Sequence, residues 1–188
     1  FPANRVYSLY QDRKGFIWMG TDIGLVRYDG EEFVTYKNPP ADSVTSMQGN
    51  IGLIQEDRQG WIWFFSIKVR MYVSVLNPNT NKIHHFLEDG KPMHGYSIYE
   101  WGDSLYLSTD HGIQLFNRRT MTVEGEILDS TFVWPRHRSQ WTDFAGCFWA
   151  RGKQGVVCYD PATGKKYHRK NNPFNWEIFR NHPDYFCI

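Results

Sequence analysis

Ten polar or aromatic residues that belong to no repeated pattern are the side chains best suited to bind a small ligand. They are Lys68, Arg70, His94, Asp110, His111, Trp134, Arg136, His137, Arg151 and Lys153. A tryptophan offers an apolar face to the C–H side of a pyranose ring, while Arg, His and Asp hydrogen-bond hydroxyl groups or carboxylates. This mixture of residue types is the one that binding of a sugar or a similar small ligand would need.

The same residues do not form a recognisable catalytic or metal-binding motif. His94, Asp110 and His111 lack the regular spacing of a metal site, and lyase chemistry would need a unique histidine with a nearby acid and a divalent metal. We therefore expect no catalytic residue, no metal and no cofactor in this chain. Three cysteines, an odd number without metal-ligand spacing, are expected to be small buried side chains, with a disulfide between the first two left open: Cys147, Cys158 and Cys187.

A fourfold internal repeat must position these side chains. Its aromatic anchors are spaced by 45, 43 and 43 residues, and an acidic residue stands six positions before each anchor. The anchors are Trp18, Trp63, Tyr106 and Trp149, and the acids are Asp12, Asp57, Glu100 and Asp143. An Asp-x-x-Gly turn, in which the carboxylate caps backbone N–H groups and Gly adopts a positive φ, precedes the anchor. Because these residues recur in the repeats, we interpret them as structural.

Each repeat contains four short β-type runs, and a period of about 40–45 residues with four strands is that of one propeller blade. The sequence therefore predicts an all-β fold, a fragment of a β-propeller. The expected blades span about 5–36, 49–86, 95–127 and 139–168, followed by a connector and the start of a fifth blade at 169–188. We expect the loops between second and third strands to share one face with the connectors between repeats. The ten candidate residues would gather on that face.

Composition agrees with this fold class. The chain has 8 Trp, 11 Tyr and 13 Phe among 188 residues, and aromatic side chains favour half-buried β-sheet surfaces. Its 21 basic and 20 acidic side chains are too balanced for nucleic-acid binding through counterion release. No apolar stretch approaches the roughly 20 residues of a membrane span, so we expect no membrane contact by this part of the protein.

The residue sequence of the first repeat resembles that of a known family. The resemblance lies in Asp12-Arg13-Lys14-Gly15-Phe16-Ile17-Trp18-Met19-Gly20-Thr21 and in Gly24-Leu25-Val26-Arg27-Tyr28-Asp29-Gly30. The first repeat is similar to the two-component regulator propeller repeat. The second repeat departs from that pattern with Phe64-Phe65 after its anchor, and the third with Trp101-Gly102-Asp103 before its anchor.

The resemblance implies a periplasmic sensor region of a Bacteroidetes hybrid histidine kinase, in which further blades and the kinase lie outside this chain. It also implies a membrane-anchored parent protein, dimeric signalling and a response to glycan-derived oligosaccharides. The alternative is a propeller enzyme of the streptogramin-lyase or polysaccharide-lyase type. A third hypothesis is a structural array that transmits dimer geometry. Self-association or packing against further blades is the expected partnership.

Overall fold

The computed structural model describes residues 1–37, 50–67, 72–129, 142–144, 147–152 and 155–181. Four antiparallel sheets of four strands each account for most of them. The first two sheets comprise β1 (Val6–Gln11), β2 (Ile17–Thr21), β3 (Gly24–Tyr28) and β4 (Phe33–Lys37), then β5 (Ile51–Glu56), β6 (Ile62–Ser66), β7 (Val73–Asn77) and β8 (Lys82–His85). The other two comprise β11 (Gly95–Trp101), β12 (Ser104–Thr109), β13 (Gly112–Asn117) and β14 (Thr122–Asp129), then β15 (Thr142–Phe144), β16 (Cys147–Gly152), β17 (Gly155–Asp160) and β18 (Lys165–His168).

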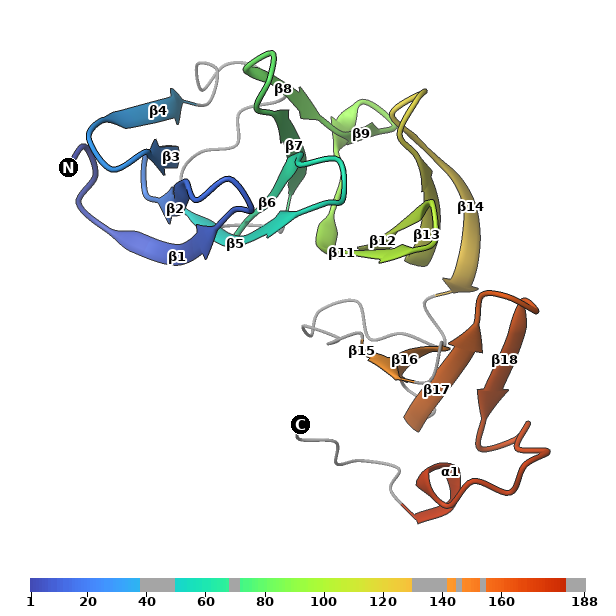
Figure 1. The fold of residues 1–188 in the computed structure, drawn as a ribbon. Helices are drawn as coiled ribbons and strands as arrows, with labels where there is room; N and C mark the ends of the chain where they lie inside the picture. The colour runs from blue at the N-terminus through green and yellow to red at the C-terminus, as the bar shows by residue number, and fades with distance from the viewer. Residues whose placement is uncertain (38–49, 68–71, 130–141, 145–146, 153–154, 182–188) are drawn as a thin grey trace. The chain divides into compact units, whose positions relative to one another are not determined.

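Strand order equals chain order in every sheet, so each repeat forms a simple meander (Figure 1). A two-stranded ribbon, β9 (Leu87–Glu88) with β10 (Lys91–Pro92), lies between the second and third sheets along the chain. One short helix, α1 (Ile178–Asn181), follows β18. None of the described helices is long and apolar enough to cross a membrane. The predicted all-β class is confirmed. The predicted fifth strand, at residues 185–188, lies outside the described residues.

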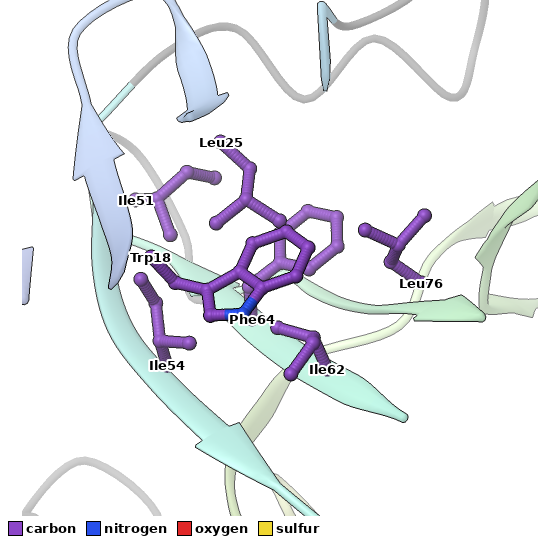
Figure 2. Packing of buried hydrophobic residues seen from close by; sticks show 7 residues of the cluster. All are labelled: Trp18, Leu25, Ile51, Ile54, Ile62, Phe64 and Leu76. Atoms are coloured by element: carbon purple, nitrogen blue, oxygen red, sulfur yellow. The ribbon is translucent and has the colours of Figure 1, made fainter. Parts of the chain in front are cut away.

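The chain divides into two compact units, Phe1–Ile98 and Tyr99–Ile188, with the boundary inside β11. The N-terminal unit is held together by a hydrophobic core between its first two sheets. That core contains Trp18, Leu25, Ile51, Ile54, Ile62, Phe64 and Leu76, seen from close by in Figure 2. The indole of Trp18 is fully buried among side chains of the next sheet.

Close backbone approach joins these two sheets. Ser8 Oγ donates to the carbonyl of Ile51 at 3.2 Å, beside Gly20, where a Cβ atom would lie 2.2 Å from that same oxygen. At the rim, the Arg13 guanidinium pairs with Glu56 at 3.2 Å and donates to the carbonyl of Asp57. Glycine at position 20 is therefore required by sheet packing, in addition to any preference of the strand.

A second core fills the C-terminal unit. Phe148 is its centre, with the rings of Tyr99, Tyr106 and Tyr159 at 4.3, 4.9 and 5.8 Å. Phe148 is almost fully buried, and Ile113, Leu128 and Val157 complete the cluster. Aromatic side chains of both central and edge strands thus hold this unit together, as expected for half-buried sheets rich in Phe, Tyr and Trp.

Candidate functional site

Of the ten candidate ligand-binding residues, His94 lies in the N-terminal unit, directly before β11. Its backbone makes an isolated antiparallel bridge with Tyr72, and the two rings lie 5.6 Å apart in a tilted arrangement. Because the imidazole is half-buried against a tyrosine, His94 has a packing role.

Asp110 and His111 form the tip of the β12–β13 turn. Thr109 Oγ1 accepts a hydrogen bond from the His111 N–H at 3.2 Å and donates to the Gly112 carbonyl at 3.3 Å. The same turn occurs in the first repeat, where Thr21 Oγ1 bonds the Ile23 N–H at 3.2 Å and the Gly24 carbonyl at 2.8 Å. A threonine therefore builds both turns, and His111 is exposed at the tip of the later one.

The remaining candidates cannot be placed. Lys68, Arg70, Trp134, Arg136, His137 and Lys153 lie outside the described residues, and Arg151 is on β16 with only its backbone described. Within the described ranges no group of three or more His, Cys, Asp or Glu side chains is arranged to hold a metal ion. His94 and the Asp110–His111 pair belong to different units, so the predicted gathering of candidates on one face stays a prediction.

The repeated acids and anchors have a clear structural use in the first two repeats. Asp12 Oδ1 accepts the N–H groups of Lys14 and Phe16 at 3.0 and 2.9 Å, and Oδ2 accepts Trp18 Nε1–H at 2.7 Å. Asp57 does the same for Gln59, Trp61 and Trp63, each at 3.0 Å. One buried carboxylate thus satisfies two turn amides and the indole of the anchor, which fixes the turn to the core.

The third repeat replaces this arrangement with an ion pair. Tyr106 has no indole N–H to offer, and Glu100 instead pairs with Arg118 of the β13–β14 turn. Arg118 also donates to the Asp103 carbonyl at 3.1 Å. Both charged side chains are 14% exposed, so the pair is largely withdrawn from water. In the fourth repeat the side chain of Asp143 is not among those described.

A second set of four side chains, one in each repeat, caps the turns between the third and fourth strands. In each repeat an Asp or Asn at the end of the third strand accepts N–H groups two or three residues ahead, at 2.8–3.4 Å. The residues are Asp29, Asn77, Asn117 and Asp160. Hydrogen bonds from Glu32 and Glu31 lower the pKa of Asp29, and the Thr163 hydroxyl foremost lowers that of Asp160. These polar residues are engaged in turn geometry.

Residues 172–181, which lie within the predicted connector at 169–188, cover the anchor of the fourth repeat. Trp149 contacts Trp176 at 5.7 Å and stacks on Phe179 at 5.8 Å. Cys158, which is fully buried, and Tyr167 complete this cluster. Burial raises the pKa of the Cys158 thiol, and its hydrogen bond with Cys147 adds to that rise. Both thiols are free. The sequence feature that corresponds to this packing is the close spacing of the aromatic residues at 174, 176 and 179.

Two adjacent histidines on β8 were also not among the residues that the sequence predicted to be functional. His85 Nδ1 lies 2.7 Å from the Oγ of Ser74, which is fully buried, and His84 contacts the ring of Phe86 at 4.6 Å. Burial lowers the pKa of both imidazoles, and the neighbouring His84 lowers that of His85 further. His85 is thus half-buried on β8 and bonded to a buried serine, whereas His84 is exposed on the same strand.

Comparison with known proteins identifies the first repeat. The family model for the two component regulator propeller matches residues 1–22, which confirms the resemblance seen in that repeat. No curated protein matches the chain.

Solved structures share the fold. The extracellular domain of a hybrid two component system from B. thetaiotaomicron aligns with a TM-score of 0.58 and 21% identity, over 92% of this chain and 26% of that one. A catalytically inactive virginiamycin B lyase from Staphylococcus aureus, crystallised with quinupristin, aligns with a TM-score of 0.58 and 15% identity, over 89% of this chain and 56% of that one. The chain therefore spans about a quarter of the first structure and about half of the second. At these identities the likeness establishes a propeller-type fold.

Proposed function

We propose that this chain is the extracytoplasmic, ligand-recognising propeller of a two-component sensor histidine kinase. In this proposal the parent protein is anchored in the inner membrane and carries its kinase outside this chain. The propeller detects glycan-derived oligosaccharides in the periplasm and signals through the geometry of a dimer.

The observation that carries the proposal is the family match at residues 1–22, together with the recurrence of the same pattern later in the chain. Asp12 and Trp18 in the matched segment have structural equivalents in Asp57 and Trp63, with the same three hydrogen bonds. The matched repeat is therefore one unit of a regular array. Two-component regulator propellers are sensor modules, and this supports a sensory role for the array.

The use of the repeated polar residues supports recognition rather than catalysis. Asp12 and Asp57 are buried and accept hydrogen bonds from turn amides and indoles, while Asp29 and Asn117 cap exposed turns. Chemistry on a ligand would therefore depend on residues in variable loops, where binding sites on rigid scaffolds are usually found. The extracellular domain with which the chain shares its fold comes from a hybrid two component system, which favours the same class.

Calorimetry on the purified chain tests this function. The chain would be titrated with neutral and acidic oligosaccharides of two to six sugar units, and its mass measured by light scattering with and without each sugar. We expect saturable binding of at least one oligosaccharide, no change in the sugar afterwards, and a shift in dimerisation on binding. A chain that binds none of them contradicts the proposal.

A second candidate is a propeller lyase, favoured by the TM-score of 0.58 to virginiamycin B lyase. Incubation with quinupristin, with and without Mg²⁺, followed by mass spectrometry separates the two functions. Metal-dependent conversion of quinupristin would establish the enzyme. Unchanged quinupristin combined with oligosaccharide binding would establish the sensor.

A further inference from the structure

The segment from Lys165 to Arg180 concentrates positive charge. It carries five basic residues against one acid: Lys165, Lys166, Arg169, Lys170 and Arg180 against Glu177. The rest of the chain then holds 16 basic and 19 acidic residues, from totals of 21 and 20. A chain with a net charge of +1 thus has a positive segment of 16 residues on a slightly negative remainder. Such local charge attracts anions that the whole molecule would not.

Two of these cations stand at the tip of a well-defined turn. His168 and Asn171 exchange backbone hydrogen bonds at 3.1 and 2.8 Å, which makes Arg169 and Lys170 the two central residues of a hairpin-like turn. Asn171 Nδ2 also donates to the Lys166 carbonyl at 2.6 Å. Arg169 and Lys170 are both exposed, so the turn holds their backbones in place while their charges meet solvent.

The next loop presents an aromatic ring beside this turn. Both ends of the loop are tied by one side chain, because Asn172 Oδ1 accepts the Trp176 N–H at 2.8 Å and Asn172 Nδ2 donates to the Trp176 carbonyl at 2.9 Å. Phe174 stacks on Trp176 at 5.1 Å with 25° between the rings, and meets Tyr167 edge-on at 5.4 Å. Tyr167 directly precedes His168 on β18, which brings the loop next to the cationic turn.

The ring of Phe174 is not needed to bury the core beneath it. Trp149, Trp176 and Phe179 already contact one another, and α1 packs against β17 (Figure 1). Phe174 is the outermost ring of this stack and remains 58% exposed. When a ligand covers a large apolar ring that a fixed loop exposes to water, the burial of apolar surface favours binding.

We infer that Phe174, Arg169 and Lys170 form a binding site for an acidic sugar unit. The open face of Phe174 stacks on the C–H side of a pyranose, while Arg169 and Lys170 bind its carboxylate or sulfate through charge-assisted hydrogen bonds. Neither the Phe174 ring nor the two cations alone would select this ligand. A neutral sugar lacks the anionic group that the cations bind, and an inorganic anion lacks the apolar face that the ring covers. This inference rests on the proposed sensory function and names its ligand class and site.

The test measures calorimetric affinity of the purified chain for three probes: a heparin-derived tetrasaccharide, cellotetraose and inorganic tetraphosphate. The variants are Phe174→Ala, Phe174→Tyr and the double variant Arg169→Ala/Lys170→Ala. Matched controls elsewhere on the chain are the exposed aromatic Phe33→Ala and the exposed turn cation Arg119→Ala. Circular dichroism of each variant verifies folding, and Phe174→Tyr retains the ring if the alanine variant does not fold.

We expect the acidic tetrasaccharide to bind more tightly than either other probe. Phe174→Ala and the double variant should each weaken it by roughly tenfold or more, the loss expected when a charged hydrogen bond or a stacked ring is removed. Phe174→Tyr and both controls should bind as the parent does.

Four results overturn the inference. Tetraphosphate that binds as tightly as the tetrasaccharide would reduce the site to unspecific charge. Equal binding of cellotetraose would remove the role of the anion. Tetrasaccharide binding that neither variant weakens would place the ligand elsewhere, which leaves the proposed sensory function intact. A chain that binds no sugar at all contradicts both proposals together.

Discussion

At the scale of single residues, the buried carboxylates of Asp12 and Asp57 connect the turn of each repeat to its core. Each accepts three hydrogen bonds from groups that are buried or partly buried. Removing such an acceptor leaves the donors without a partner, and an unsatisfied buried donor costs about 1–3 kcal/mol. An Asp in this position therefore stabilises a turn and anchors an indole through the same two oxygens.

Asp57→Ala should destabilise the chain by about 2–4 kcal/mol, because it strands the Trp63 indole N–H and two turn amides. Urea unfolding followed by tryptophan fluorescence measures this loss. Asp103→Ala removes an exposed carboxylate from the corresponding turn of the third repeat and should change stability by less than about 0.5 kcal/mol. Equal effects of the two substitutions would contradict the role given to Asp57.

His85 makes stability depend on pH. Burial lowers the pKa of His85 below the value of about 6.5 that an unfolded chain would show, so the unfolded state binds the proton more readily. The stabilisation is therefore complete above pH 6.5 and is lost as the pH falls below it. Urea midpoints at pH 7.5 and 5.5 should differ less in His85→Gln than in the parent. A difference that the substitution leaves unchanged would exclude His85 as the source.

At the scale of elements, sheets pack because particular strands come unusually close. The Gly20 position faces the Ile51 carbonyl and the Ser8 hydroxyl, and leaves no room for a methyl group. Gly95 is similarly crowded by Val73, with 2.8 Å from its Cβ position to that side chain. Between β5 and β11, Gln55 makes a two-way bridge with the backbone of Ile98, at 2.9 and 3.4 Å. Small residues and short polar bridges thus set the spacing of neighbouring strands.

Gly20→Ala should cost about 1–3 kcal/mol, since its Cβ would overlap a backbone oxygen that cannot rotate away. The matched control is Gly125→Ala on β14, where nothing lies within 4 Å of the added carbon and the strand has no positive φ. Thermal unfolding of the two variants should separate them clearly. A stable Gly20→Ala protein would mean that the first two sheets pack differently in solution.

The regular part of these elements can be predicted from the sequence. Asp-x-x-Gly fixes the first turn, since Gly15 and Gly60 adopt φ of 90° and 79° and their Asp partners cap the amides. The Glu100–Arg118 pair and α1 could not be predicted, because both depend on contacts outside the repeat period. Residues 172–181 hold few β-type signals, and only the packing of Trp176 and Phe179 on Trp149 gives them a structure.

The candidate site was predictable to a lesser degree. Asp110 and His111 were expected in a loop and lie in a β12–β13 turn, because their repeat position fixes their place. Phe174, Arg169 and Lys170 were not singled out, since periodicity says nothing about a ring that is exposed only after a loop folds back. Recognition residues that break a repeat are visible in sequence, whereas those created by packing become visible in the structure.

At the scale of the whole molecule, exposed apolar side chains mark surface that could be covered. Leu9 on β1 is 68% exposed, and Phe33 on β4 is 42% exposed with its ring stacked on Tyr28 at 4.6 Å. The register places Leu9 on the face of the first sheet that points away from Ile51 and its core. Burial of such side chains favours association.

We expect the chain to self-associate through this face of the first sheet. Light scattering across a hundredfold range of concentration should show a dimer or larger species that Leu9→Lys shifts toward the monomer. Lys91→Glu, a charge change on an exposed residue of β10, should leave the mass distribution as it is. A parent chain that stays monomeric at all concentrations contradicts the expectation.

The meander order of the strands has a consequence for how the chain folds. Every strand in the four sheets pairs with its immediate neighbours along the chain, so contacts within a sheet close short loops. Low sequence separation between contacting residues favours fast folding, and each sheet can nucleate independently before it docks on the next. Stability is then close to a sum of sheet terms and nearest-neighbour interfaces. Loss or insertion of one whole sheet would change two interfaces and leave the others intact, which lets such arrays vary in length without losing their fold.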